Sequence, residues 1–114
     1  MNKVLLVGRI VKQAELRNTA EKEIPYTRFT IAVDREDNKG KESEADFVQV
    51  VLWGKRAERL VEYLNKGKLV NVIGSLRSGK YEKGDGTIKY YSEVFGEKVY
   101  LLDVKGKKEE VSAS

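Results

Sequence analysis

The sequence contains no cysteine and no histidine. Without cysteine the chain can form no disulfide, no thiolate metal site and no cysteine nucleophile. Without histidine it lacks the commonest general base and the commonest metal ligand. Carboxylates such as Glu15, Asp46 and Glu93 are scattered and follow no metal-ligand spacing. We therefore expect a binding protein rather than an enzyme, and we expect no metal or other cofactor.

Long hydrophobic runs are also missing. The apolar run near the N-terminus, Val4–Val7, has only four residues. A signal peptide or a membrane-spanning helix needs a considerably longer run. We expect a cytoplasmic protein that has no membrane partner.

Charge, by contrast, is plentiful. Lysine and arginine number 22 against 18 aspartates and glutamates, which gives a formal net charge of +4. This balance is compatible with a polyanionic partner, although many basic domains bind nothing charged. At 114 residues the chain is expected to form one domain. Because the composition turns polar after Asp103, we place the domain at 1–103 and a flexible polar tail at 104–114.

The densest run of strand-forming residues is Asp46–Trp53. Successive side chains of a strand point to opposite faces. One face therefore carries only aliphatic side chains and is predicted to be core. The other face carries Phe47, Gln49, Val51 and Trp53, which is a poor composition for a core. Either the two rings fill a second hydrophobic layer, as in a sandwich, or they face a ligand.

The remaining elements follow from periodicity and from glycine. We expect a helix of about three turns, because Ala57, Leu60, Val61 and Leu64 form one apolar stripe and Gly67 supplies a left-handed stop. The polar stretch 12–22 is expected to be a loop or part of a hairpin, and 34–46 a solvated connection. Gly8 and Gly96 suggest bends. Strands are expected at Lys3–Val11, Thr27–Val33, Asp46–Trp53, Lys68–Arg77 and Ile88–Leu102, the last two joined by a turn at Lys83–Gly86.

Five strands with one short helix between the third and the fourth are the element order of the OB-fold. This fold is an all-β, five-stranded, partly open Greek-key barrel. We expect the helix to plug the bottom of that barrel.

Several motifs follow one another in an order and at a spacing that are typical of one known family. They are Asn2–Arg9, Glu15–Arg17, Phe29–Val33, Asp46–Phe47, Leu52–Lys55, Ala57–Glu58, Tyr63–Gly67, Gly74–Arg77, Tyr81 and Glu93–Val94. On these motifs the chain resembles bacterial and phage single-stranded DNA-binding proteins of the homotetrameric OB-fold type, over Asn2 to Asp103. The resemblance implies sequence-tolerant binding of single-stranded DNA in replication, recombination and repair, assembly into a homotetramer, and association with the nucleoid.

The resemblance also implies a set of nucleic-acid-binding residues. Phe47, Trp53 and Tyr81 match aromatics that stack on bases in the family, and this favours the ligand-facing role for the first two. Tyr81 could instead pack on its own hairpin, and each cation could be an ordinary solvated charge. The cations that match or accompany the family's basic positions are Lys55, Lys66, Arg77, Lys80, Arg9, Lys12, Arg17 and Lys3.

The sequence departs from the family in two places. The family's further aromatic after the second strand is missing from 34–37, which Arg35, Lys39 and Lys41 would partly offset. The acidic, hydrophobic-tipped tail that recruits repair and replication proteins has no counterpart in 104–114, so tail-mediated partners are in doubt. We expect a naturally short form or a truncated chain.

Other possibilities remain open at this point. Asn2–Leu6 is expected to be an edge strand that could pair with its copy, and Tyr90, Tyr91 or Tyr100 could lie at a subunit contact. A primosomal replication protein would share the fold but form a dimer. An OB-fold protein-interaction module would bind no nucleic acid.

Overall fold

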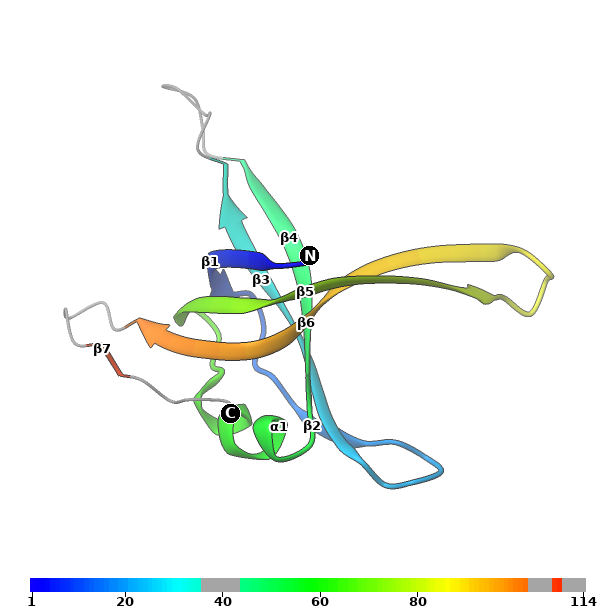
Figure 1. Cartoon of the computed structure of the whole chain (residues 1–114), viewed down its shortest axis with the longest axis horizontal. Helices are drawn as coiled ribbons and strands as arrows, with labels where there is room; N and C mark the ends of the chain where they lie inside the picture. The colour runs from blue at the N-terminus through cyan, green and yellow to red at the C-terminus, as the bar shows by residue number, and fades with distance from the viewer. Residues whose placement is uncertain (36–43, 103–107, 110–114) are drawn as a thin grey trace.

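The computed structural model describes residues 1–35, 44–102 and 108–109. Figure 1 shows a small barrel from which hairpins extend, with a short helix at one end. The elements are β1 (Val4–Ile10), β2 (Leu16–Asn18), β3 (Pro25–Asp34), β4 (Ala45–Trp53), α1 (Lys55–Leu60), the 3₁₀ turn η1 (Val61–Tyr63), β5 (Leu69–Glu82), β6 (Ile88–Leu102) and β7 (Lys108–Glu109).

The strands close into a ring. Hydrogen-bonded neighbours follow the order β1-β5-β6-β4-β3, and β1 also pairs with β3. The β4–β6 pairing is parallel, whereas the other pairings of the ring are antiparallel. Five strands in this order, with α1 between β4 and β5, make the Greek-key barrel of the OB-fold. The fold class predicted from the sequence is confirmed.

The two halves of β1 have different neighbours. Val4–Arg9 pairs with β5, but only Arg9 and Ile10 pair with β3. Gly8 lies where the strand crosses from one neighbour toward the other. A Cβ atom there would lie 2.6 Å from the carbonyl oxygen of Ala32, so close backbone approach requires this glycine. The far edge of β1 from Val4 to Gly8 has no partner strand among the described residues.

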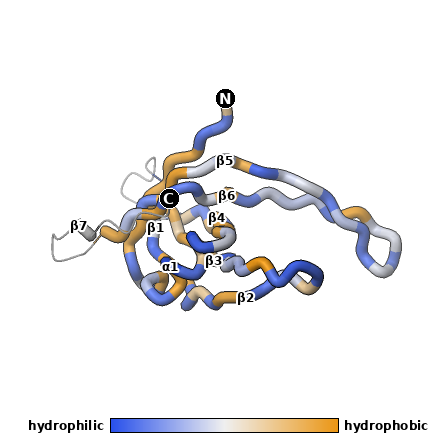
Figure 2. The backbone as a smooth tube through the Cα atoms, turned by 60° about the horizontal axis from the view of Figure 1, so that its bottom comes forward, coloured by the Kyte–Doolittle hydropathy of each residue, from blue (hydrophilic) through white to orange (hydrophobic). Residues whose placement is uncertain are grey.

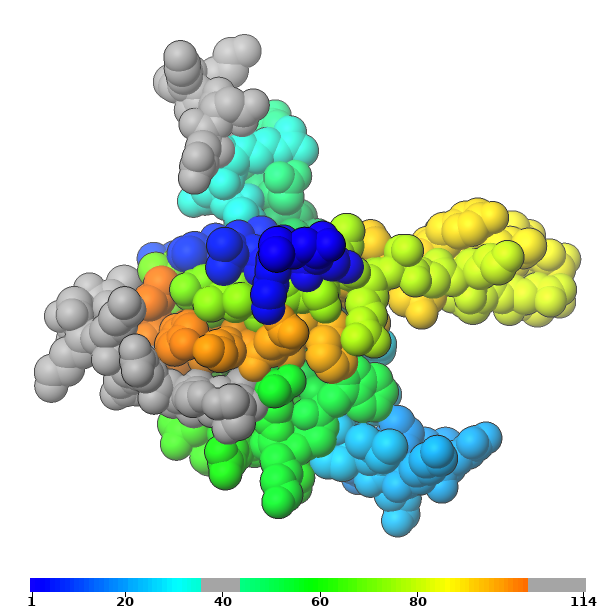
Figure 3. Space-filling view, in the orientation of Figure 1, coloured from blue at the N-terminus to red at the C-terminus, as the bar shows by residue number. Residues whose placement is uncertain are grey.

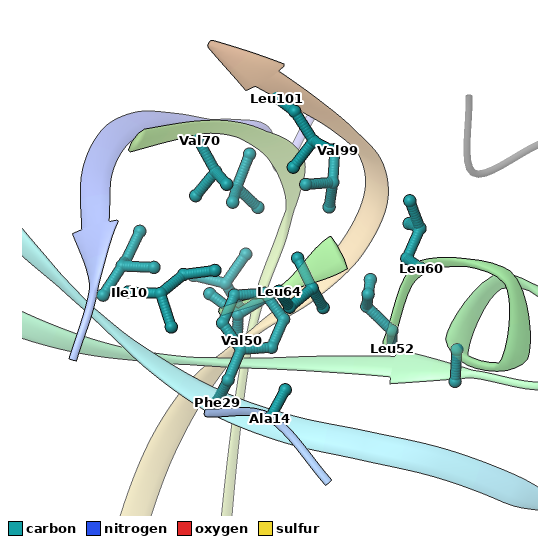
Figure 4. Packing of buried hydrophobic residues seen from close by; sticks show 14 residues of the cluster. Ile10, Ala14, Phe29, Val50, Leu52, Leu60, Leu64, Val70, Val99 and Leu101 are labelled. Carbon is teal, nitrogen blue, oxygen red and sulfur yellow. The ribbon is translucent and has the colours of Figure 1, made fainter. Parts of the chain in front are cut away.

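Alternation along the strands builds the core, as predicted. Phe29 and Ile31 of β3 meet Val50 and Leu52 of β4 inside the barrel, and each is 4% exposed or less. Figure 4 shows how their side chains converge with those of the other strands. The remaining buried members are Ile10, Ala14, Val70, Val72, Val94, Val99 and Leu101, with Ala57, Leu60 and Leu64 from the helical segment.

The helix is shorter than the predicted three turns. The α-helical part has six residues, and the chain then tightens into a 3₁₀ turn. The Leu64 N–H donates to the carbonyl of Val61 at 3.2 Å, and this tightening leaves Leu64 fully buried. Gly67 then adopts φ 88°, the predicted left-handed stop. The apolar stripe is thus confirmed, while the length of the α-helix was overestimated.

Strands β5 and β6 extend far beyond the barrel as one hairpin, here called the arm (Ser75–Phe95). The predicted fourth strand ends at Arg77, but β5 continues to Glu82 before the predicted turn. Figure 3 shows the arm in yellow-green and yellow, projecting from the barrel. Much of the arm is hydrophilic or neutral, as the blue and white tube of Figure 2 shows. Between Leu76 and Ser92, side chains on both faces of the arm are therefore exposed to solvent.

A β-bulge lies at the base of the arm. Ile73 pairs with Lys98 and Gly74 with Gly96, so Glu97 has no opposite residue. The bend predicted at Gly96 is explained by this irregularity, since bulges bend a strand and increase its twist. Lys3 of the N-terminus bonds the bulged Glu97 at 2.8 Å. That hydrogen bond lowers the pKa of the Glu97 carboxyl.

Two predictions concern the ends of elements. The stretch 12–22 forms part of a hairpin, because β2 pairs with the start of β3. Within the predicted tail, β7 pairs with β6 next to Leu101 and Leu102, and the rest of 103–114 lies outside the described residues. The domain boundary after 103 therefore stays a prediction. In the described part of the chain no helix is long and apolar enough to cross a membrane.

Candidate nucleic-acid interface

The outer face of β3 and β4 carries exposed rings. Phe47 of β4 is 69% exposed, so the described part of the chain forms no second hydrophobic layer over it. Trp53 is half-buried, because the ring of Tyr26 on β3 lies against it with centroids 5.0 Å apart. Trp53 follows Phe47 by six positions, which places the two residues about 20 Å apart along β4. The two predicted rings thus share one face, at opposite ends of the same strand.

Val51, which has the same parity, does not share their exposure. It is only 1% exposed, because its cross-strand neighbours are Arg28 on one side and Phe95 on the other. The face whose composition is poor for a core therefore contains one fully buried residue, Val51. The sequence could not indicate that side chains from β3 and β6 would cover this position.

Two residues of this face were missed. The strand predicted to begin at Thr27 excludes Tyr26, although the strand begins at Pro25. Arg28 lies within the predicted strand but is not among the predicted binding residues. Its guanidinium lies 5.8 Å from the Tyr26 ring centroid, and its Nε donates to Glu93 at 3.0 Å. Extending the alternation by one pair of residues would have placed Tyr26 beside Arg28.

A hollow of about 360 Å³ lies beside the Tyr26 ring, between the β2 hairpin and the β3–β4 face. Lys12, Arg17 and Arg28 line it together with Tyr26 and Gln49. Arg17 also lies 3.4 Å from Glu15, but both side chains are exposed, so this ion pair is weak. The structure thus brings two predicted cations and one missed cation to the edge of an aromatic surface.

The arm supplies a second group. Tyr81 is 52% exposed and contacts Tyr91 of the same hairpin, with centroids 6.2 Å apart. Tyr81 therefore packs on its own hairpin and still remains accessible to solvent. Nearer the barrel, the Arg77 guanidinium lies 4.3 Å over the ring of Phe95. Such a cation–π contact orders a long side chain at modest energy.

The other predicted cations are more dispersed. Lys55 begins α1 two residues after Trp53 and is exposed. Arg9 donates to the Gly67 carbonyl at 3.0 Å, which brings it close to Lys66.

Lys80 pairs with Tyr90 across the arm and so lies on the face opposite Tyr81. Of the predicted set, Lys80 is the cation that the strand register separates most clearly from the rings.

Arg35, expected to offset the missing aromatic, is engaged by two carboxylates. Its guanidinium lies 3.1 Å from Glu44 and 2.9 Å from Asp46. The hydrogen bond to Asp46 raises the pKa of Arg35. Lys39 and Lys41, expected to act with it, lie outside the described residues. Within the described ranges there is no group of three or more carboxylates that could hold a metal ion.

Comparisons with known proteins agree with this geometry. The sequence model of the single-strand binding protein family matches residues 1–102. The single-stranded DNA-binding protein of Clostridium tetani is 43% identical over 103 residues, which cover 90% of this chain and 71% of that protein. Single-stranded DNA-binding protein 1 of Clostridium acetobutylicum is 43% identical over 106 residues, covering 92% and 96%.

A solved structure has the same fold. The structure described as a Plasmodium falciparum SSB complex with ssDNA superposes with a TM-score of 0.77 at 24% identity. The match covers 90% of this chain and 96% of that chain.

Proposed function

This chain belongs to the single-strand binding protein family, and from that premise we propose that it binds and protects single-stranded DNA with little regard to sequence, in replication, recombination and repair. The observation that carries the proposal is the exposed Phe47 ring, on the same sheet face as the Tyr26–Trp53 pair. Phe47 is 69% exposed, and together with the Tyr26–Trp53 pair it gives this face aromatic surface on which bases can stack.

The mechanism follows from the chemistry of the two groups on this face. Unpaired bases stack on Trp53, Phe47 and Tyr81, since every base has a π-face and stacking is tolerant of sequence. OB-fold single-strand binding proteins are an established example of this mechanism. Cations beside the rings follow the phosphates, and we place Lys12, Arg17, Lys55 and Arg77 in that role, with Arg9, Lys66 and Lys80 further from the rings.

The sequence analysis left two alternatives open: a dimeric primosomal replication protein and an OB-fold protein-interaction module. The match to the single-strand binding protein family over residues 1–102 favours neither of them. We propose that the chain acts by binding alone, without catalysis or a cofactor, in the cytoplasm with the DNA.

The test uses the only tryptophan of the chain as its probe. Adding oligo-dT should quench Trp53 emission, because a base stacks on the indole ring. With a labelled oligonucleotide, Trp53→Ala should weaken binding about tenfold or more, whereas Trp53→Phe retains a ring and should lose less. A folded Trp53→Ala protein that binds oligo-dT as tightly as the parent would exclude this site.

The same titration at several salt concentrations tests the phosphate contacts. Each neutralised phosphate of a single strand contributes about −0.7 to the slope of log K against log salt. A slope near zero would remove the electrostatic part of the mechanism. Duplex DNA offers no unstacked bases and should bind far more weakly.

We also propose assembly with other copies of the chain, as a homotetramer. Among the residues that the structure describes, the outer edge of β1 from Val4 to Gly8 has no partner strand. This part of β1 carries Leu5 and Val7, which are 71% and 49% exposed. Val7, Asn71 and Tyr100 form one cross-strand row on the outer face of the barrel. An open strand edge beside an apolar face is suited to pairing with a second chain.

A further inference from the structure

A second hollow, of about 350 Å³, lies where the arm leaves the barrel. Trp53 lines it from β4 and Tyr91 lines it from β6, so two rings from distant parts of the sequence share one space. Val51 and Phe95 add apolar surface. This volume is at the small end of the range for small-molecule sites, which is about 300–1,000 Å³. It suits one planar base.

The Tyr91 ring can lie across the arm because the residue opposite it has no side chain. Its cross-strand partner is Gly79. A Cβ atom at that position would lie 2.5–2.9 Å from three atoms at the phenol end of Tyr91. The ring can therefore lie over the neighbouring strand only because residue 79 is glycine. Tyr91 remains 46% exposed, so it is supported by the arm and still open to solvent.

Polar groups of the hollow suit a nucleotide rather than a purely apolar ligand. Arg77 and Glu93 face each other across the arm and both line the space. The Glu93 carboxylate accepts from Arg28 at 3.0 Å, which offsets its repulsion of a phosphate. The Arg77 guanidinium then remains as the cation of the hollow that can contact a phosphate of the DNA backbone. Rings, an apolar wall and a cation together match the needs of a stacked base and its phosphate.

We propose that Tyr91 is a further stacking residue, and that this hollow takes one base of the bound strand between the arm and the barrel. The inference rests on the proposed function and extends it to a residue that neither the sequence nor the comparisons assign. Tyr91 links Trp53 on the barrel to Tyr81 on the arm. The strand can thus pass from barrel to arm without leaving a ring surface.

The chain provides a matched control in the neighbouring tyrosine. Tyr90 is 73% exposed and lies on the opposite face of the same strand. Tyr91→Ala should weaken oligo-dT binding about fivefold or more, and Tyr90→Ala should change it less than twofold.

Tyr91→Phe keeps the ring and should bind like the parent. Tyr91→Leu covers Gly79 without a π-face and should bind like Tyr91→Ala, which keeps the test valid if the alanine variant folds poorly.

A second ligand separates stacking from a structural effect on the arm. On an oligonucleotide of abasic sites, Tyr91→Ala and the parent should bind equally, because there is no base to stack. A loss that persists on the abasic strand, or equal losses for Tyr90→Ala and Tyr91→Ala, overturns the inference. If Tyr91→Ala binds like the parent while Trp53→Ala does not, this inference fails and the proposed function stands. If neither variant loses affinity, the proposed function fails too.

Discussion

Phe29 and Phe47 lie on paired strands and have opposite surroundings. Phe29 is 4% exposed inside the barrel, whereas Phe47 is 69% exposed on its outer face. Strand parity puts the two rings on opposite faces, since both residues lie in regular antiparallel pairing between β3 and β4. Phe47 is also left uncovered, unlike Val51, which has the same parity but lies between Arg28 and Phe95 and is buried. The same side chain therefore serves stability at one position and, as we propose, base stacking at the other.

Alanine substitutions at these two positions should have opposite effects. Phe47→Ala should weaken oligo-dT binding about fivefold or more, with the melting temperature unchanged within error, because the ring makes little core contact. Phe29→Ala should lower the free energy of unfolding by about 3–5 kcal/mol by leaving a cavity. Labelled-oligonucleotide anisotropy and thermal unfolding measure the two effects. A Phe47→Ala protein that loses stability but keeps its affinity would contradict the assignment.

Ring orientation at single residues depended on partners that the sequence pattern does not reveal. Tyr91 and Tyr90 are adjacent and chemically identical, and the pattern alone did not resolve which way either one faces. Gly79, twelve residues earlier, decides the position of Tyr91 by leaving room for its ring. Register between the two strands of the arm supplies this information, and register is a property of the folded hairpin.

At the scale of elements, the bulge at Gly74 and Gly96 sets where the barrel ends and the arm begins. A Cβ atom on Gly74 would lie 2.1 Å from the carbonyl oxygen of Phe95. This neighbour is backbone and cannot rotate away. The close approach lets β5 and β6 twist apart from the barrel while their pairing continues to Glu82 and Ile88.

Gly74→Ala should therefore destabilise the fold by about 1–3 kcal/mol, since a methyl group forces the two backbones apart. Gly84→Ala is the matched control, because nothing lies within 4 Å of a Cβ atom at the tip of the arm. Its effect should stay within about 0.5 kcal/mol. Denaturant unfolding of both variants gives the comparison. If Gly74→Ala and Gly84→Ala have the same free energy of unfolding, the prediction is wrong, because the backbone at Gly74 would then accommodate a methyl group without loss of stability.

The length of the arm could not be predicted from periodicity. Hydrophobic alternation ends near Leu76 because the strands leave the core there, yet β5 continues for six more residues to Glu82. Solvated strands carry no apolar pattern. Only the turn at Lys83–Gly86 indicated that the two strands were still paired at that distance.

At the scale of the whole molecule, two residues of β1 close the barrel against β3, and within the described ranges the rest of that strand has no partner on its outer edge. The exposed side chains of Leu5 and Val7 stand beside this edge. Stability within one chain does not require them, since the core cluster forms without them. Their exposure is explained if a second chain covers them.

Leu5→Glu should therefore lower the mass of the assembly, because a charge would be buried at the contact between chains. Leu16→Glu is the control, since Leu16 is also an exposed leucine, 44% exposed, but lies on β2 away from this edge. Sedimentation velocity of the three proteins is the measurement. A parent protein that sediments as a monomer would rule the assembly out.

The sequence by itself determined the strand faces, the apolar stripe of the helix, the left-handed glycine after it and the absence of cysteine and histidine chemistry. These properties are local, because alternation and helical periodicity depend on neighbours a few residues apart. It also placed Phe47 and Trp53 on one face, since both belong to one strand.

Only the tertiary structure decided which side chains meet across strands. It brought Tyr26 onto Trp53, joined Arg28 to Glu93 over 65 residues of chain, and buried Val51 between β3 and β6. Closing a barrel fixes the register of every strand against its neighbours. Contacts between distant residues follow from that closure, so no pattern within a single segment could have given them.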